Sequence, residues 1–160
     1  MASMQKITPF LWFDHQAEEA ATFYTSIFKN SKILEVSRYG DAGPGPKGSA
    51  MVVKFQLEGI EFLALNGGPH FKLNEAFSLT VNCDTQDEVD DYWAKLTADG
   101  GTPSQCGWLK DKFGLSWQVV PTIVSKIMGS SDSKKSGRAM QALMQMRKLD
   151  IAALEAAYNG

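Results

Sequence analysis

The sequence of 160 residues has little of what marks export, redox chemistry or nucleic-acid binding. Sixteen Lys and Arg face 18 Asp and Glu, and a net charge of −2 is too low in positive charge to favour a phosphate-backbone partner. The only two cysteines, Cys83 and Cys106, form no CxxC pair, so we predict two free thiols and no zinc or redox centre. Apolar runs such as residues 10–13 fall far short of the roughly 20 residues of a membrane span. Residues 1–6 also lack the pattern of a secretory signal, and we therefore expect a cytoplasmic protein.

Hydrophobic residues make up 44% of the chain, which is enough to build a sizeable core. The first half has one helical period among several strand patterns, and Glu58 and Gly59 stand where a tight hairpin turn is expected. Asp14 precedes the helical pattern, where its carboxylate would cap the helix. Residues 40–48 are rich in glycine and proline and predict a loop. We expect a strand at 7–13, a helix at 15–28 and strands at 32–39, 49–57 and 60–65.

The second half repeats this plan. Thr85 and Glu88 have the spacing of a capping box at the start of a helix predicted for residues 86–98. A strand at 77–83 precedes that helix, and a glycine turn followed by an apolar strand at 114–120 matches residues 59–65. Five residues of the second half, at an offset of 70 from Leu11, Phe13, Asp14, Glu18 and Phe23, are Val81, Cys83, Asp84, Glu88 and Trp93. We interpret this as an internal duplication of a β-α-β-β-β module, with modules at about 5–68 and 75–121 in a body of residues 1–128.

After a short helix predicted at 122–128, residues 129–137 are polar and predict an exposed connector. Residues 138–160 then predict a helical tail of two helices, the second capped by Asp150. Three of the seven methionines lie in this tail, so we expect an adaptable apolar surface that packs on the body or on a partner subunit.

Five segments together resemble the PhnB-like branch of the vicinal oxygen chelate superfamily, the glyoxalase and bleomycin-resistance group. They are ITPFLWFD at 7–14, NGGP at 66–69, CDTQDEVD at 83–90, CGWLKDKFGLSWQ at 106–118 and MQMRKLD at 144–150. The resemblance implies an α+β, glyoxalase-like fold in which two modules with curled mixed sheets enclose a cavity. It also implies a homodimer through pairing of modules across chains. Members of this branch often carry the label 3-demethylubiquinone-9 3-methyltransferase, although neither strand-helix junction here has the glycine-rich loop usual for methyl transfer from S-adenosylmethionine.

The superfamily commonly holds a metal ion on His, Glu or Gln side chains of the first and last strands of its modules. The resemblance places those positions at Ile7 or Thr8, Phe77 or Ser78, Ala64 and Gln118. Gln118 alone is of a ligand type, whereas a stable divalent site needs about three protein donors. We therefore predict that the chain binds neither the usual metal nor another cofactor.

Aromatic side chains lie on the predicted strands, where alternate residues point to opposite faces. Each could pack in the core, or several together could line a cavity for planar ligands. Gln118 could bind neighbouring backbone or point at a ligand. The candidate ligand-binding residues are Trp12, Phe62, Asn66, Phe77, Trp108, Trp117 and Gln118.

Two residues are candidate acid-base groups. His70 follows a turn-rich segment and is either a solvated loop histidine or a base held over a cavity mouth. Asp111 lies among alternating charges and is either at the solvated tip of a hairpin or the only carboxylate near the cavity. No basic residue adjoins Cys106 in sequence, so the sequence does not predict a nucleophilic thiol.

Two functions remain open from the sequence. The first is a protein that binds a small organic molecule in an aromatic-lined cavity without a metal. The alternative is an enzyme of the same superfamily, an isomerase, lyase or transferase that includes the methyltransferase label, with His70, Asp111 or Gln118 as polar and acid-base groups.

Overall fold

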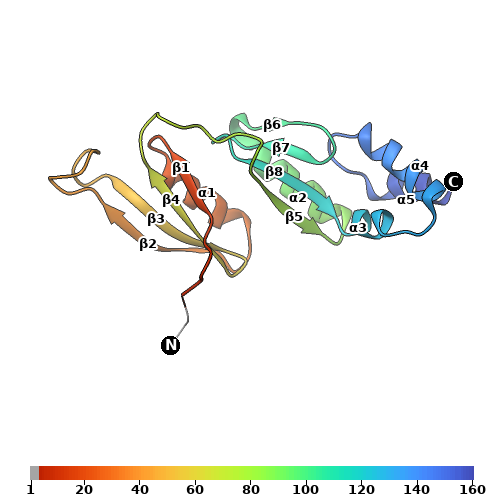
Figure 1. Cartoon of the computed structure of the whole chain (residues 1–160), viewed down its shortest axis with the longest axis horizontal. Helices are drawn as coiled ribbons and strands as arrows, with labels where there is room; N and C mark the ends of the chain where they lie inside the picture. Colours follow the sequence, from red (N-terminus) through yellow and green to blue (C-terminus); the bar gives the residue numbers. More distant parts are fainter. Residues whose placement is uncertain (1–3) are drawn as a thin grey trace. The chain divides into compact units, whose positions relative to one another are not determined.

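A computed structural model describes residues 4–160. The chain forms two compact units that divide between Leu73 and Asn74, and each unit has its own four-stranded sheet (Figure 1). The first unit contains β1 (Phe10–Phe13), α1 (Ala17–Ile27), β2 (Lys32–Arg38), β3 (Ala50–Leu57) and β4 (Ile60–Asn66). The second contains β5 (Ser78–Cys83), α2 (Gln86–Thr97), β6 (Thr102–Pro103), β7 (Trp108–Lys110), β8 (Ser116–Pro121), α3 (Ile123–Met128), α4 (Ser133–Met144) and α5 (Ile151–Asn159).

The two sheets have the same topology. Their strand orders are β1-β4-β3-β2 and β5-β8-β7-β6, and in each the first strand pairs in parallel with the last while the other pairs are antiparallel. The helix after the first strand, α1 or α2, packs against the strands of its own unit (Figure 1). The duplicated β-α-β-β-β plan and the α+β class predicted from the sequence are therefore confirmed.

The core of the first unit lies between its sheet and α1. On β3 the buried residues Val53, Phe55 and Leu57 alternate with half-buried ones, as a strand with one covered face requires. The ring of Phe55 stacks on that of Phe62 with 5.4 Å between centroids, and Tyr24 of α1 packs on Phe55 from the helix side. This alternation leaves the second face of the sheet, the open face, without a covering helix in its own unit.

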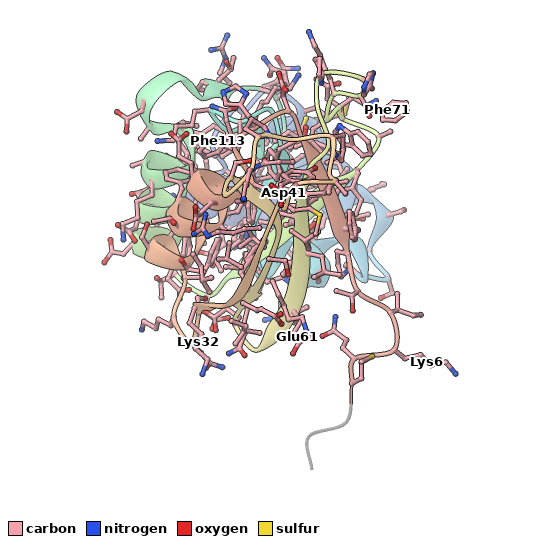
Figure 2. All side chains as sticks on the ribbon, turned by 90° about the vertical axis from the view of Figure 1, so that its left-hand side faces the viewer. Lys6, Lys32, Asp41, Glu61, Phe71 and Phe113 are labelled. Atoms are coloured by element: carbon pink, nitrogen blue, oxygen red, sulfur yellow. The ribbon has the colours of Figure 1, made fainter. Side chains whose placement is uncertain are left out.

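The turn between β3 and β4 is the tight hairpin that the sequence predicts. Glu58 and Gly59 have φ values of 48° and 82°, and two consecutive positive φ angles are the mark of a type I′ turn. Lys32 and Glu61 lie at this end of the first sheet, opposite the end where Phe71 lies (Figure 2).

The cap of α1 differs from the prediction. No side chain at the helix start caps it, so Asp14 is not the cap; instead Asn66 Oδ1, at the end of β4, accepts a hydrogen bond of 2.7 Å from Ala17 N. The side-chain nitrogen of Asn66, Nδ2, donates a hydrogen bond to Ala50 O, and the backbone carbonyl of Asn66 accepts one from Tyr39 Oη. An acceptor 49 residues away in sequence satisfies the helix start, which no local pattern could reveal.

In the second unit α2 is capped as predicted, because Thr85 Oγ1 accepts a hydrogen bond of 3.2 Å from Glu88 N. In the hairpin between β7 and β8, Asp111 is not at a solvated tip, the first of the two alternatives that the sequence left open. Asp111 is only 3% exposed; its Oδ1 accepts from Phe113 N and Leu115 N, and its Oδ2 accepts from Trp117 Nε1 at 2.8 Å. The carboxylate accepts hydrogen bonds from backbone N–H groups of the turn, and Asp111 is therefore buried inside the hairpin.

The tail also differs in part from the prediction. Helix α4 begins at Ser133, inside the stretch expected as a connector, because Asp132 caps it by accepting from Lys134 N and Lys135 N. The predicted cap of α5 is confirmed, since Asp150 Oδ1 accepts from Ala153 N. A small core joins α3, α4 and α5, formed by Ile127, Ala139, Leu149 and Leu154.

The tail is fastened to the sheet-bearing part of the second unit by polar contacts. Gln86 at the start of α2 donates to Leu149 O and accepts from Ile151 N, and Lys148 forms an ion pair with Asp90. Hydrogen bonding to Lys148 lowers the pKa of the Asp90 carboxyl. Across the described residues, no helix has the length and apolar character needed to cross a membrane.

Candidate functional site

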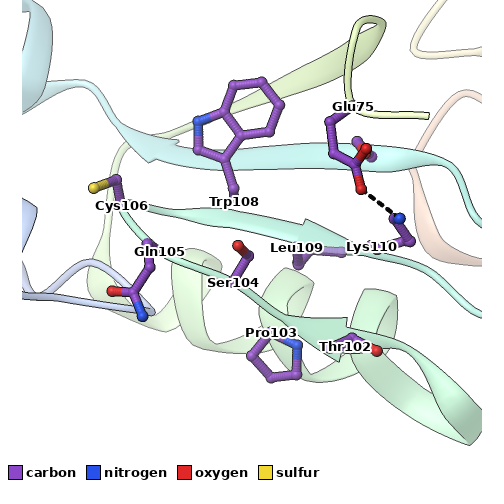
Figure 3. Close-up of a pocket in the computed structure, with 10 residues that line it drawn as sticks. Glu75, Thr102, Pro103, Ser104, Gln105, Cys106, Trp108, Leu109 and Lys110 are labelled. Atoms are coloured by element: carbon purple, nitrogen blue, oxygen red, sulfur yellow. Dashed lines mark ion pairs between the residues drawn. The ribbon is translucent and has the colours of Figure 1, made fainter.

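The second sheet also has an open face, the face that α2 does not cover. A pocket of about 600 Å³ lies on it (Figure 3). Trp117 and Val119 of β8 are buried on the face that α2 covers. The alternate residues Ser116 and Gln118 therefore belong to the open face. Strand β7 continues this face with Trp108 opposite Gln118 and Lys110 opposite Ser116. The residues that line the pocket are Glu75, Thr102, Pro103, Ser104, Gln105, Cys106, Trp108, Leu109, Lys110 and Ser116.

Ser116 is the most unusual residue of this pocket. It is 1% exposed, and its Oγ has no hydrogen-bond partner among the described residues. It lies between two polar neighbours in the sheet, Ser78 on β5 and Lys110 on β7. A buried hydroxyl without a partner costs about 1 to 3 kcal/mol, so a position that keeps one calls for an explanation outside the fold.

Two opposite charges meet at the edge of the pocket. The Lys110 ammonium pairs with the Glu75 carboxylate, which reaches it from the segment that precedes β5 (Figure 3). Hydrogen bonding to Lys110 lowers the pKa of the Glu75 carboxyl from its usual value. These are the only two charged side chains among the lining residues.

Gln118 lies next to the pocket on the same face. Its Nε2 donates a hydrogen bond of 3.0 Å to the side-chain hydroxyl of Ser78. This partner is neither the neighbouring backbone nor a ligand, the two alternatives that the sequence left open. Trp108, opposite Gln118, is half-buried and presents an apolar wall to the pocket.

The loop between β6 and β7 forms another wall, and the tail holds it in place. Cys106 N and Gly107 N donate hydrogen bonds of 2.8 Å each to Met146 O and Arg147 O. Cys106 has a φ of 61° and Gly107 one of 84°, and a Cβ at position 107 would lie 3.0 Å from Leu149 and from Val119 O. The close approach of the tail therefore requires glycine at 107 and holds Cys106 at the pocket.

The first unit has a separate pocket of about 390 Å³ at the end of its sheet. Both histidines of the chain, His15 and His70, line it together with Asp14. His15 Nδ1 lies 3.6 Å from Asp14 Oδ2. Asn66 also lines this pocket, but its side-chain atoms are engaged in the helix cap and in the bond to Ala50 O.

Trp12 supports the loop on which His70 lies. Its Nε1 donates a hydrogen bond of 2.9 Å to Gly68 O, and its ring contacts Phe71 edge-on with 4.9 Å between centroids. Trp12 is on the open face of the first sheet, because its neighbours Leu11 and Phe13 are buried beneath α1.

The structure thus divides the predicted site residues between the two pockets, the interior and the surface. Trp108 lines the pocket of the second unit, with Gln118 beside it, while His70 and Asn66 line that of the first. Phe62 and Trp117, 5% and 2% exposed, lie in the cores beneath the helices, and Asp111 is bound inside its hairpin, so none of these three lines either pocket. Phe77 is exposed just before β5.

The candidate residues predicted from the sequence do not include Ser116, Lys110 or Glu75. Alternation gives a signal for the first, because Ser116 lies two residues before Gln118 and so shares its face. Lys110 stands two residues after Trp108 on β7 in the same way. Nothing in the sequence indicates that Glu75, which precedes the strand β5, reaches Lys110.

The residues do not fit the metal site that the resemblance implies. In residues 4–160 no group of three or more His, Cys, Asp or Glu side chains is placed to hold a metal ion. The strand pairing also corrects one position: Phe10 pairs with Leu63 as Thr80 pairs with Gln118, so Leu63 and not Ala64 is the counterpart of Gln118. The donor set at these positions is too poor for a divalent ion.

Residues 5–120 match the family model of 3-demethylubiquinone-9 3-methyltransferase. This matched region spans both sheets and the two pockets described above. The chain belongs to this PhnB-like family. A PhnB protein from Bacillus cereus with the same methyltransferase description is 40% identical, covers 74% of this chain and 100% of its own, and has a TM-score of 0.68. The helices α3 to α5 follow the part that the family model matches.

More distant structures have the same fold. A glyoxylase/bleomycin resistance protein/dioxygenase domain from Frankia is 13% identical, with a TM-score of 0.50, and covers 74% of this chain and 93% of its own. The fosfomycin resistance protein FosX from Listeria monocytogenes, in complex with Mn(II) and sulfate, is 15% identical, with a TM-score of 0.53, and covers 80% of this chain and 98% of its own. The chain therefore has the predicted glyoxalase-like fold. A comparison with curated proteins gave no match.

Proposed function

We propose that this PhnB-like protein binds a small organic molecule in the pocket on the open face of the second sheet, without a metal. The observation that carries this proposal is the Ser116 hydroxyl, which is buried at the wall of a pocket of about 600 Å³ and has no hydrogen-bond partner within residues 4–160. A ligand group would supply the hydrogen bond that the protein does not.

The chemistry of the walls supports this reading. Ligand pockets of a few hundred Å³ combine apolar walls with a few polar groups that set orientation. Here Trp108 provides apolar surface, and Ser116 and Lys110 provide polar groups on neighbouring strands. An indole ring held in a sheet offers a flat surface for a planar ligand.

The test is a thermal-shift screen of small molecules combined with native mass spectrometry of protein purified without chelator. A ligand present at 100 times its Kd adds about 2.7 kcal/mol to the folded state, so true ligands raise the Tm. Trp108→Ala should abolish the shifts, whereas Phe71→Ala, which removes an exposed aromatic ring from the first unit, should leave them unchanged. Failure of every compound, together with no co-purified molecule, would overturn the proposal. Stoichiometric metal in the same spectra would overturn its metal-free part.

A second candidate is an enzyme of isomerase, lyase or transferase type, the transferases including the family's methyltransferase label. It is favoured by the pocket of the first unit, which gathers His15, His70 and Asp14 from two separate loops. Histidine exchanges protons near neutral pH and is suited to acid-base work. Turnover of a compound found in the screen, lost in His70→Ala and retained in Trp108→Ala, would favour this candidate over simple binding.

We also propose that the protein is a cytoplasmic homodimer. The open face of the first sheet supports the dimer, since it presents a continuous apolar row in which Phe10 pairs with Leu63 and Trp12 with Leu65. Phe10 is 54% exposed, and such a patch is usual at protein interfaces. Light scattering should give twice the chain mass, and Phe10→Asp with Leu63→Asp should give the monomer.

A further inference from the structure

We propose, on the basis of the binding function above, that the pocket of the second unit takes a planar molecule bearing a carboxylate, which displaces Glu75 from Lys110 and accepts a hydrogen bond from Ser116. The inference rests on which groups of the pocket belong to the sheet and which do not.

The positive charge is part of the sheet. Lys110 is the last residue of β7, and β7 pairs with β8 on one side and with β6 on the other. Ser116 is its direct partner on β8. Directly opposed residues on one face of a sheet have their Cβ atoms about 5 Å apart, so one ligand group can contact both the ammonium and the hydroxyl.

The negative charge is not part of the sheet. Glu75 lies three residues before β5, in a turn, and 64% of its side chain is exposed to solvent. An exposed ion pair of this kind contributes little stability. The Glu75 carboxylate thus shows what kind of group Lys110 binds, and it can leave at small cost when a ligand carboxylate arrives.

Ser116 explains why the ligand is the better partner. Glu75 leaves the Ser116 hydroxyl without a hydrogen bond among the described residues, although Lys110 is its direct neighbour. A ligand carboxylate has two oxygens, of which one can pair with the Lys110 ammonium and the other can accept from Ser116 Oγ. The ligand satisfies two groups where Glu75 satisfies one.

The planar part of the ligand is assigned from the apolar wall. Trp108 lies two residues before Lys110, so both side chains are on the same face of β7. A carboxylate held at Lys110 therefore places the body of the ligand along the indole ring.

The experiment measures binding of 2-naphthoate and of its neutral counterpart 2-naphthamide by calorimetry, up to about 10 mM. The two probes share the ring system and differ in charge. Naphthoate should bind at least about tenfold more tightly, since a hydrogen-bonded charge pair is worth roughly that factor or more. Lys110→Gln should remove this preference, while Lys95→Gln, which removes the same charge from α2 outside the pocket, should retain it.

Two further variants separate the ligand from the fold. Ser116→Ala should weaken naphthoate binding about threefold to tenfold, yet leave the Tm of the free protein unchanged or raised, because it removes a buried group that has no partner in the described part of the chain. Glu75→Gln should strengthen naphthoate binding by up to about fivefold, because the internal competitor is lost. A fall in Tm for Ser116→Ala, or weaker binding in Glu75→Gln, would contradict the assignment.

The outcomes also separate this inference from the proposed function. Equal affinity for the two probes overturns the assignment of a carboxylate and leaves small-molecule binding intact. If naphthoate does not bind but other compounds stabilise the protein, the assignment of a carboxylate is likewise overturned and small-molecule binding is retained. Failure of all compounds in the screen removes both.

Discussion

The two sheets share a topology but differ in what their two faces carry. On the covered faces, equivalent positions are all buried and apolar: Phe55 corresponds to Leu109, Phe62 to Trp117 and Ala64 to Val119. On the open faces, the row Lys54, Gln56, Glu61 and Leu63 of the first sheet corresponds to Trp108, Lys110, Ser116 and Gln118 of the second. The fold constrains one face of each sheet, and the other face is free to diverge.

This difference teaches where function can be sought in a duplicated fold. A residue beneath a helix is restricted by close packing, whatever its chemistry. Only the open face of the second sheet combines an aromatic wall, a positive charge and a hydroxyl without a partner among the described residues. The first unit instead has its histidine-bearing pocket at the end of its sheet.

The largest expected effect tests the covered faces. Phe62→Ala and Trp117→Ala should each lower the free energy of unfolding by about 3 to 5 kcal/mol, because each empties a packed core site. Their open-face neighbours Leu63→Ala and Gln118→Ala should lower it by less than about 1.5 kcal/mol, as surface positions do. Urea unfolding measures both pairs. Equal losses for Phe62→Ala and Leu63→Ala would end the distinction between the faces.

The next effect concerns the two hairpins. Asp111→Ala leaves the amides of Phe113 and Leu115 and the indole of Trp117 without their acceptor, and each buried donor so stranded costs about 1 to 3 kcal/mol. Glu58→Asn in the first hairpin should change stability by less than about 0.5 kcal/mol, because asparagine tolerates the positive φ. Chemical unfolding of both variants makes the comparison, and a mild Asp111→Ala would contradict its structural role.

A smaller effect compares the helix caps. Asn66→Ala and Thr85→Ala each remove a capping acceptor and should lower stability by about 1 kcal/mol, with more for Asn66 because Ala50 O also loses its donor. Asp14→Ala should have no measurable effect on the unfolding midpoint. A loss at Asp14 equal to that at Asn66 would restore the local cap expected from the sequence.

The smallest expected effect concerns the two cysteines, which should differ in their reactivity toward an alkylating reagent. Burial, with help from Glu88 and Asp84, raises the pKa of the Cys83 thiol to about 11, so Cys83 stays protonated at pH 8. Iodoacetamide at that pH should label Cys106, which lines the pocket, and spare Cys83; mass spectrometry of peptides gives the answer.

The same pKa shift has a consequence for stability. A raised pKa in the folded state means that Cys83 stabilises the fold below pH 9.0, the ordinary pKa of a thiol, and that this contribution falls as pH rises toward about 11. Cys83→Ala should flatten that decline in the unfolding curves, and Cys106→Ala should not.

Much of the fold was predictable because its signals are local. The alternation on β3, the Glu58-Gly59 turn and the caps at Thr85 and Asp150 each depend on a few neighbouring residues. The offset of 70 between the halves added the duplication. The start of α4 at Ser133 was missed because a polar helix that packs on one side alone resembles a connector in composition.

The sequence by itself determined which segments are strands and helices, since backbone propensity, turn chemistry and hydrophobic period act over one or two turns of chain. Only the tertiary structure decided which face of each strand is covered, and so which aromatic residues became core and which became pocket wall. It also decided the pairs formed across the fold, Asn66 with the start of α1 and Glu75 with Lys110, because hydrogen bonds and charges act on neighbours in space. For the same reason the sequence could not reveal the unpaired Ser116 hydroxyl. Whether a hydroxyl lacks a hydrogen-bond partner among the described residues can be found only from the positions of its neighbours in space.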